Sequence, residues 1–390
     1  MDEKIKQLFT LLPKTDEKTV DFERIKETIL SPFYHGLIST MQNPLYHAEG
    51  NVYTHTEMVT QALVETDQFG KEEKSVRLCL FLAALFHDVG KIKTTRLENG
   101  AWTSPHHAEA GERAVRAYLW NELGLSGTKE RVLLREAVCS YIRYHMKPSY
   151  LPEYTNARRT ALRYASEGEL LPLFSLFRLC LLAEADARGR ISDDLASSLE
   201  KIAFTRELIR EYACENGAYP FPTRHTKFSY LSGKNISPEL AFYDDTKFEV
   251  VMLSGLPGVG KDTYISDRLH GMREISLDKI RTQMKISPSE PQGAVIAHAR
   301  EQARELLRKQ IPFVWNATNL TDEVRQNQVE LFSKYGARTK IIYLECDYGE
   351  NLLRNRNREA YVPEQVIERL VSKTRPPRPY EAHSVEWEFV

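Results

Sequence analysis

Apolar positions recur with helical spacing over the first part of the chain, up to about Cys214. In residues 129–145 the positions on one helical face are Val132, Leu133, Ala137, Val138 and Tyr141. Residues 75–86 and 171–183 are apolar on nearly every face, which predicts helices buried on all sides. Strand-like alternation is not evident here. The pattern therefore predicts an all-helical domain.

From Phe248 onward, short apolar runs alternate with amphipathic segments. The runs predict strands at residues 250–254, 274–276, 312–315 and 340–345. The intervening segments predict helices at residues 261–270, 292–309 and 322–335. This strand–helix order indicates a parallel sheet covered by helices on both faces.

Residues 215–247 separate the two patterns. Gly217, Pro220, Pro222 and Gly233 interrupt any regular element there, and aromatic residues are interleaved with them. A flexible linker would contain fewer aromatic residues, so we expect an irregular connector that packs on a domain. The predicted fold class is multidomain: an all-α domain at 1–214, a connector at 215–247 and an α/β domain at 248–390.

Composition narrows the class of protein. A chain of 390 residues exceeds what one hydrophobic core usually supports, and 42% hydrophobic with 27% charged residues is ordinary for a globular protein. The net charge of -1 neither supports nor excludes a nucleic-acid partner. Five scattered cysteines, a charged start without a signal-peptide core and no long apolar run lead us to expect a cytoplasmic protein with no membrane partner.

The helical part contains a series of residues that bind metals. His87 and Asp88 end its most apolar helix, and Asp186 ends the next most apolar one. A buried carboxylate is costly unless partners meet it, and a shared divalent cation would serve several residues at once. The whole set is His55, His87, Asp88, His107, His145 and Asp186. Mixed nitrogen and oxygen ligands suit one or two ions of Mn, Fe, Co, Ni or Zn better than Ca. The other histidines, His47 among them, are interpreted as ordinary.

This ordered set resembles the HD phosphohydrolase superfamily over roughly residues 45–195. The resemblance rests on Tyr53-Thr-His55-Thr, Phe86-His87-Asp88-Val-Gly-Lys91 and Ala185-Asp186-Ala-Arg188-Gly-Arg190. It implies that His55, His87, Asp88 and Asp186 hold one metal, and that Asp88, His107 and His145 hold the second. His107 is preferred to the neighbouring His106 because Ala108-Glu-Ala-Gly111 follows it. Lys91, Arg188 and Arg190 are candidates for neutralising a substrate phosphate.

The second half contains a phosphate-binding loop, Gly255-Leu-Pro-Gly258-Val-Gly260-Lys261-Asp262-Thr263. Its glycines let backbone N–H groups turn toward phosphate oxygens, and its lysine supplies a charge for the β- and γ-phosphates. A predicted strand precedes the loop and a predicted helix follows it. Asp262 stands where a hydroxyl residue is usual, so Thr263 is the predicted Mg²⁺ ligand.

Polar residues follow the later strands of this half. Asp278 could accept the proton of an acceptor hydroxyl, and Arg281, one turn on, could hold a phosphate of that acceptor. Asn316-Ala-Thr-Asn319 ends the next strand, at the expected ligand crevice. A basic segment at 353–358 could close over the triphosphate.

These segments resemble the 5′-hydroxyl polynucleotide kinase family over residues 248 to about 378. The resemblance implies that Lys261 and Thr263 serve nucleotide phosphates and Mg²⁺, and that Asp278 is the general base. It also implies that Arg281 binds the acceptor's phosphate, and that Arg358, with Arg354 as the second candidate, is the lid arginine. Asn316 departs from the family, where an acidic residue often precedes Ala-Thr-Asn.

The pairing resembles the HD-Pnk family of bifunctional end-healing enzymes. The resemblance implies NTP-dependent phosphorylation of 5′-hydroxyl ends and metal-dependent removal of 2′,3′-cyclic phosphate or 2′-phosphate ends. The implied partners are nucleic-acid ends, RNA or DNA, and the NTP donor with Mg²⁺. A second copy of the chain and a separate ligase are candidate protein partners.

Three alternatives remain open at this point. The first is a small-molecule nucleotide or nucleoside kinase fused to an HD nucleotidase. The second follows from residues 185–190, which also resemble the HD part of bacterial tRNA nucleotidyltransferases, although no nucleotidyltransferase catalytic domain accompanies them here. The third is a nucleotide-sensing regulator that binds phosphates without turnover.

Overall fold

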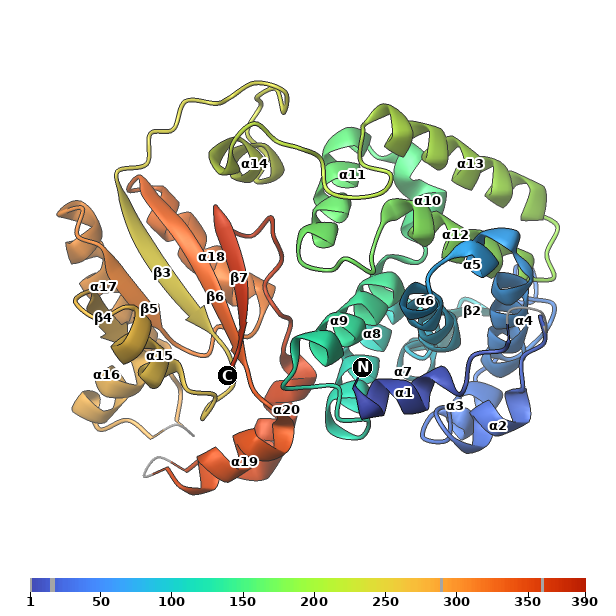
Figure 1. The fold of residues 1–390 in the computed structure, drawn as a ribbon, viewed down its shortest axis with the longest axis horizontal. Helices are drawn as coiled ribbons and strands as arrows, with labels where there is room; N and C mark the ends of the chain where they lie inside the picture. The colour runs from blue at the N-terminus through green and yellow to red at the C-terminus, as the bar shows by residue number, and fades with distance from the viewer. Residues whose placement is uncertain (1, 15–17, 288–289, 359–360) are drawn as a thin grey trace. The chain divides into compact units, whose positions relative to one another are not determined.

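A computed structural model describes residues 2–14, 18–287, 290–358 and 361–390. The chain divides into two compact units, one comprising Met1–Leu125 with Lys129–Tyr219 and the other Ser126–Thr128 with Pro220–Val390 (Figure 1). The division falls inside the segment that the sequence assigns to a connector. Each unit is described by itself.

The first unit is built almost entirely of helices. Its elements are α1 (Glu3–Phe9), α2 (Phe22–Glu27), α3 (Tyr34–Ser39), α4 (Val52–Glu65), α5 (Asp67–Lys71), α6 (Lys74–Phe86), α7 (Lys91–Thr94), β1 (Arg96–Glu98), β2 (Ala101–Thr103), α8 (His107–Asn121), α9 (Lys129–Tyr144), α10 (Lys147–Tyr150), η1 (Leu151–Glu153), α11 (Ala157–Ala165), η2 (Ser166–Glu169), α12 (Leu176–Arg188) and α13 (Leu195–Glu211).

Helix α6 is the central element of this unit. Every residue from Leu78 to Phe86 is buried, as expected of a helix that is apolar on all faces. It packs against α4, α9 and α12. Helix α4 starts where Asn51 Oδ1 accepts a hydrogen bond from Thr54 N at 2.9 Å, which places His55 in its first turns. Side chains at the ends of these helices therefore meet at the carboxyl end of α6.

Two glycines permit close approach around that end. A Cβ atom on Gly90 would lie 1.9 Å from the carbonyl oxygen of His107, so only glycine lets the turn after α6 touch the start of α8. A Cβ atom on Gly189 would lie 2.5 Å from Val59 Cγ2, so glycine lets the end of α12 approach α4. Both glycines stand beside predicted metal ligands, and larger residues there would separate the helices.

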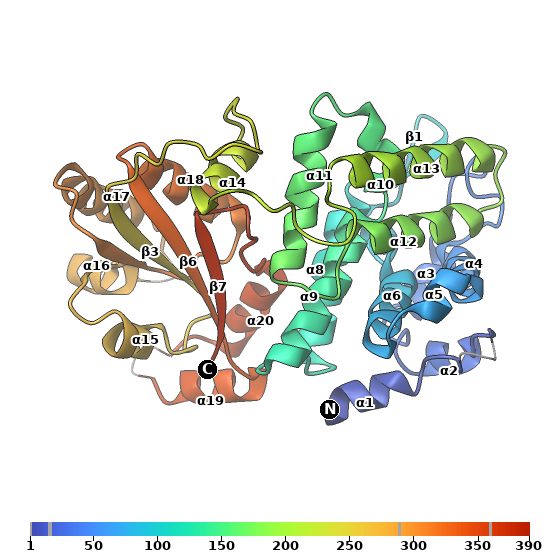
Figure 2. The same ribbon diagram turned by 45° about the horizontal axis from the view of Figure 1, so that its top comes forward.

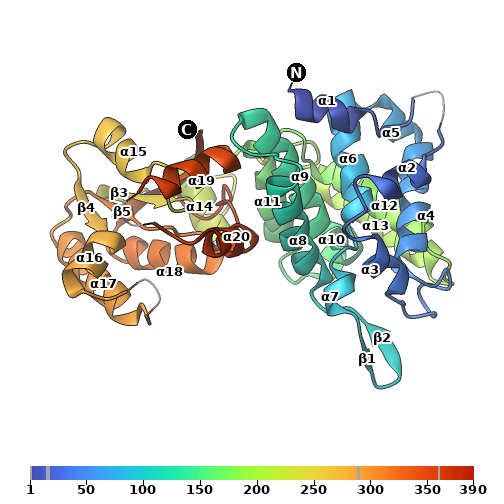
Figure 3. The ribbon, with the colours of Figure 1, turned by 90° about the horizontal axis from the view of Figure 1, so that it is seen from below.

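Strands β1 and β2 form a hairpin that the helical pattern did not predict (Figure 3). It pairs Arg96 with Thr103 and Leu97 with Trp102. The connecting Asn99 and Gly100 have φ values of 51° and 80°, the left-handed conformation typical of a two-residue hairpin turn. Each strand is three residues long and lacks a buried face, so periodicity gives no strand signal.

The second unit alternates strands and helices. Its elements are α14 (Arg224–Leu231), β3 (Phe248–Ser254), α15 (Lys261–Arg268), β4 (Arg273–Ser276), α16 (Leu277–Met284), α17 (Gly293–Arg308), β5 (Phe313–Asn316), α18 (Asp322–Ser333), β6 (Ala337–Glu345), α19 (Tyr348–Arg356), α20 (Glu364–Lys373) and β7 (Ser384–Phe389).

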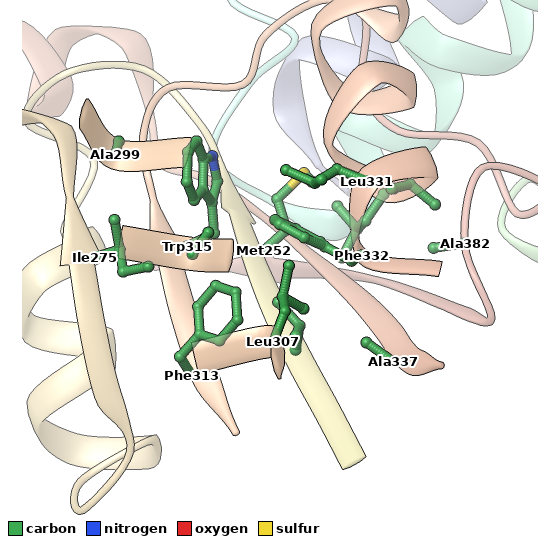
Figure 4. Packing of buried hydrophobic residues seen from close by; sticks show 14 of the residues in the cluster. Met252, Ile275, Ala299, Leu307, Phe313, Trp315, Leu331, Phe332, Ala337 and Ala382 are labelled. Carbon is green, nitrogen blue, oxygen red and sulfur yellow. The ribbon is translucent and has the colours of Figure 1, made fainter. Parts of the chain in front are cut away.

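The five strands form one parallel sheet in the order β4-β5-β3-β6-β7, part of which is seen in Figure 2. Alternate residues of β3 face opposite sides. Val250 and Met252 join a core with α17 and α18, in which Trp315 meets Phe332 (Figure 4). Val251 and Leu253 join a second core beneath α15. The sheet is therefore covered on both faces, which explains why the central strands β3 and β5 are apolar runs without alternation.

The observed elements confirm the predicted fold class, an all-helical domain followed by an α/β domain with a parallel sheet. Helix α14 lies within the predicted connector, and β7 extends the sheet beyond the predicted strands. Among the described residues, no helix combines the length and apolar character needed to cross a membrane.

Candidate active sites

The six predicted metal ligands of the first unit lie together and are buried. His55 comes from α4, His87 and Asp88 from the end of α6, and His107 from the start of α8. His145 follows α9, and Asp186 lies near the end of α12. The packing of α4, α9 and α12 on α6, and of α8 on α9, brings together residues separated by more than 100 positions.

Hydrogen bonds orient all four imidazoles in the same way. Nδ1 of His87 donates to Ala84 O at 2.8 Å, and Nδ1 of His107 donates to Ser104 O at 2.8 Å. The corresponding bonds of the other two join His145 to Ile142 O at 2.7 Å and His55 to Gly189 O at 3.0 Å. A carbonyl oxygen only accepts, so the proton stays on Nδ1 and each Nε2 presents a lone pair.

These lone pairs face one another. His55 Nε2 lies 3.3 Å from His87 Nε2, and His107 Nε2 lies 3.4 Å from His145 Nε2. Two acceptors at such a distance repel unless a cation or proton lies between them. Burial lowers the pKa of His145 to about 3, so its imidazole is neutral and able to bind a metal.

Asp88 lies between the two histidine pairs. Its Oδ2 is 3.3 Å from His87 Nε2 and 3.5 Å from His55 Nε2, whereas its Oδ1 is 3.3 Å from His107 Nε2 and 3.9 Å from His145 Nε2. Oδ1 is buried without a hydrogen-bond partner in the described structure. A buried carboxylate oxygen without a hydrogen-bond partner, beside two imidazole lone pairs, is suited to binding a cation.

Two cations balance the carboxylates. Lys91 Nζ lies 2.6 Å from Asp88 Oδ2 and donates to Gln42 Oε1 at 2.7 Å. Arg190 Nη2 lies 2.6 Å from Asp186 Oδ2, while Asp186 Oδ1 lies 3.1 Å from His55 Nε2. Burial alone would raise the pKa of Asp88, but the charge of Lys91 helps to hold it well below its usual value. The third predicted phosphate-binding cation, Arg188, is exposed.

The donor atoms form two overlapping groups that fit two metal ions. His55, His87 and Asp88 make one, and Asp88, His107 and His145 make the other, each with donors within 4.8 Å of one another. The structure brings His107 into the second group, whereas His106 is exposed and has a φ of 55°. Nitrogen and carboxylate donors in these numbers suit divalent transition metals.

A third group was missed by sequence reasoning. Glu49 Oε1 lies 2.8 Å from His47 Nδ1 and 3.1 Å from His55 Nδ1. Burial raises the pKa of Glu49, but both histidines and Ile191 N more than offset this and lower it. Glu49 is therefore an anion placed to orient His55 from behind. The only signal in the sequence is His47-Ala-Glu49, six residues before His55, which is too short to be distinctive.

The second candidate site starts at the carboxyl end of β3. Gly255, Gly258 and Gly260 have φ values of 152°, 81° and 103°, which other residues rarely adopt. A Cβ atom on Gly255 would also lie 2.6 Å from Leu344 O. The loop therefore turns sharply before α15, with its backbone at the start of that helix, as phosphate binding requires.

Lys261 is folded over this loop. Its Nζ donates to Gly255 O at 3.0 Å and to Leu256 O at 2.8 Å. Burial lowers the pKa of Lys261 to about 8, against the opposing charges of Asp278 and Asp262. The charges of both carboxylates therefore act on the ammonium group, which is held against two carbonyl oxygens of the loop.

The predicted acceptor residues form a pair. Asp278 and Arg281, both on α16, make an ion pair, and Arg281 Nε donates to Gln292 Oε1 at 2.7 Å. The side chain of Asp278 is 71% exposed, so it is open to an incoming hydroxyl.

Helix α19 lies beside the phosphate loop. Arg354 Nη1 approaches Val259 O at 3.4 Å, and Asn351 Nδ2 donates to Pro257 O at 3.0 Å. Arg358 follows this helix, and its charge helps to lower the pKa of Lys261. Both candidate lid arginines thus lie near the loop.

The residues after Lys261 differ in their contacts. Asp262 Oδ1 accepts a hydrogen bond from Asn316 Nδ2 at 2.8 Å, and the same nitrogen donates to Glu274 Oε1 at 2.7 Å. Thr263 is exposed, and no hydrogen bond of its hydroxyl is found among the described residues. Glu274 was not singled out by sequence reasoning, because its position in a short strand gives no chemical signal.

Two families match the chain. Residues 52–173 match the model of the HD domain family, and residues 250–377 match that of an AAA domain family with a kinase-like P-loop. The chain joins an HD domain to a P-loop domain. These matches support a phosphohydrolase domain that binds divalent metals, joined to a kinase-type phosphotransferase domain. No curated protein matches the chain significantly.

Proposed function

We propose that this HD–P-loop chain heals nucleic-acid ends. The P-loop domain would phosphorylate 5′-hydroxyl ends, and the HD domain would remove 2′,3′-cyclic phosphate or 2′-phosphate. One observation carries the proposal: the exposed carboxylate of Asp278, whose charge acts on the lysine of the phosphate loop, is ion-paired with the partly buried guanidinium of Arg281. A base beside a phosphate-binding cation suits an acceptor that carries both a hydroxyl and a phosphate, as a nucleic-acid end does.

The kinase step follows from these positions. Asp278 would accept the proton of the 5′-hydroxyl while the hydroxyl oxygen attacks the γ-phosphorus of the nucleotide. The nucleoside diphosphate would then leave. Arg281 would hold the acceptor's neighbouring phosphate. Lys261 would leave its two loop carbonyls and pair with the β- and γ-phosphates. Arg358 or Arg354 would add charge as the nucleotide binds. Mg²⁺, when bound with the nucleotide, would neutralise further charge.

The hydrolase step uses the HD site. Divalent ions held by the two donor groups would polarise the phosphoryl group and lower the pKa of the attacking water. Asp88 would fix the spacing of the two donor groups, because each of its oxygens faces one histidine pair. Lys91 and Arg190 would orient the two carboxylates and remain close enough to attract a phosphate. Water would open the cyclic ester by breaking one P–O bond, and a second hydrolysis would release phosphate.

The test uses two labelled RNA strands with the whole protein. A strand with a 5′-hydroxyl is incubated with γ-labelled ATP and Mg²⁺, and a strand ending in 2′,3′-cyclic phosphate is incubated with Mn²⁺, Co²⁺, Ni²⁺ or Zn²⁺. Label transfer to the first and loss of phosphate from the second would support the proposal. Phosphorylation of mononucleosides but not of oligonucleotides would instead indicate a small-molecule kinase. ATP binding without any product under any metal would indicate a regulator.

A further inference from the structure

The position after the P-loop lysine has an unusual residue in this chain. In P-loop enzymes a serine or threonine hydroxyl there contacts Mg²⁺, and a carboxylate at the end of a nearby strand completes the arrangement. Here the loop position is Asp262, and the residue at the carboxyl end of β5 is the amide Asn316. These two residues, separated by 54 positions, are hydrogen-bonded at 2.8 Å. The carboxylate and the neutral group have therefore exchanged places.

The contacts of Asn316 account for its being an amide. Both donations of its Nδ2 go to carboxylates, to Asp262 at 2.8 Å and to Glu274 at 2.7 Å. The side chain is nearly fully buried. An aspartate at this position would place a third carboxylate against the other two with no proton between them, which is unfavourable. An amide at position 316 is therefore compatible with the carboxylate of Asp262, and its hydrogen bond holds that carboxylate at the sheet edge.

Thr263 lacks comparable contacts. It is one residue further along α15, which turns its side chain about 100° around the helix axis from that of Asp262. It is exposed, and its hydroxyl makes no hydrogen bond among the residues described. Only Asp262 is tied to the strand end beside the phosphate loop.

We propose that Asp262, held in place by Asn316, is the residue that contacts the nucleotide-bound Mg²⁺. The proposal rests on the kinase function proposed above and replaces Thr263 as the ligand. It has a distinctive consequence, because a carboxylate beside the phosphates repels a nucleotide that arrives without its cation. Nucleotide binding by this protein should therefore depend on Mg²⁺ more strongly than it would if position 262 carried a hydroxyl residue.

The test measures ATP affinity by calorimetry in EDTA and in Mg²⁺, without any turnover assay. In Asp262→Ser, affinity in EDTA should rise roughly tenfold, a value between the water and protein-surface limits of Coulomb's law, and the gain from Mg²⁺ should fall by a similar factor. Thr263→Val should stay within about twofold of the wild type, since the Thr263 hydroxyl makes no hydrogen bond in the described part of the chain. Asp267→Ser, on the same helix and exposed, is the matched control and should change neither value.

The double variant Asp262→Ser with Asn316→Asp restores the usual arrangement and should recover the Mg²⁺ dependence that Asp262→Ser loses. If the double variant shows no more Mg²⁺ dependence than Asp262→Ser, the claim that the carboxylate and the neutral group have exchanged positions is overturned. Wild-type Mg²⁺ dependence in Asp262→Ser, or its loss in Thr263→Val, would overturn the assignment. Thermal melting checks that each variant is folded. If the double variant does not fold, the comparison of Asp262→Ser with Thr263→Val decides the Mg²⁺ assignment.

The outcomes separate the two proposals. If the wild type binds ATP with a Mg²⁺ dependence that Asp262→Ser loses, but no 5′-hydroxyl is phosphorylated, the Mg²⁺ assignment stands and the end-healing function fails. If the wild type binds no nucleotide in either condition, both fail.

Discussion

Asp88→Asn is the sharpest test of the HD site. The substitution keeps the shape of the side chain and removes one negative charge between two histidine pairs. In the present structure Asp88 Oδ2 lies 3.3 Å from His87 Nε2, and Oδ1 lies 3.3 Å from His107 Nε2. Both metal positions therefore lose the same anionic ligand in a single step.

The expected loss of metal affinity in Asp88→Asn can be estimated from the effect of losing a shared ligand. Removing a group that merely orients a metal ligand typically weakens metal binding by about 10- to 100-fold, so losing a shared ligand should cost at least about 100-fold for each ion. That corresponds to about 2.8 kcal/mol per ion. The asparagine can still accept a hydrogen bond from Lys91, but that buried ammonium loses its counter-charge. We therefore expect a further loss of about 1–3 kcal/mol in the free energy of unfolding.

Metal content and activity are measured on the same preparations. Elemental analysis should find about one to two transition-metal ions per wild-type chain and far fewer in Asp88→Asn. Hydrolysis of 2′,3′-cyclic phosphate should disappear while 5′-phosphorylation under Mg²⁺ persists. Glu112→Gln is the matched control, because it removes a buried carboxylate that pairs with two arginines, Arg116 and Arg143, each at 2.7 Å. It should reduce stability but keep the metal content.

Two results would refute this reasoning. One is full phosphoesterase activity in Asp88→Asn. The other is an active wild-type protein after exhaustive chelation with no metal added back. Equal metal loss in Glu112→Gln would mean that the effect of Asp88→Asn comes from general destabilisation.

Three further predictions concern single residues. Lys261→Ala should abolish 5′-phosphorylation and leave cyclic-phosphate hydrolysis unchanged in parallel end-labelling assays, so a joint loss would contradict separate sites. Arg281→Ala should raise the KM for an oligonucleotide at least about tenfold, the usual effect of losing a charged hydrogen bond, with ATP affinity unchanged by calorimetry. An equal loss of both would remove it from the acceptor site. Gly90→Ala should lower the free energy of unfolding by about 3 kcal/mol in denaturant titrations, because its Cβ atom would lie 1.9 Å from His107 O. Gly70→Ala, with no atom within 4 Å of its Cβ, is the control.

Local pattern was sufficient for much of the fold. The predicted helix at residues 75–86 is α6, and the predicted strand at 250–254 is part of β3. Both are long, strongly apolar segments whose burial their own sequence dictates. Short or exposed elements escaped prediction. The β1–β2 hairpin has no buried face, although Asn99-Gly100 is a recognisable turn signal. Strand β7 alternates Val385, Trp387 and Phe389 with polar residues, which is a recognisable strand signal.

The sequence by itself also determined which residues are chemically suited to each site, because the ordered histidines and aspartates and the glycine loop need no structure to be recognised. Tertiary packing decided how they meet. His107 and His106 are adjacent in sequence, and only the approach of α8 to Gly90 brings His107 to Asp88. Glu49 stands behind His55, and Asn316 holds Asp262 across 54 positions. Such contacts depend on how helices and strands pack, and periodicity along the chain carries no information about distances between elements that are far apart in sequence.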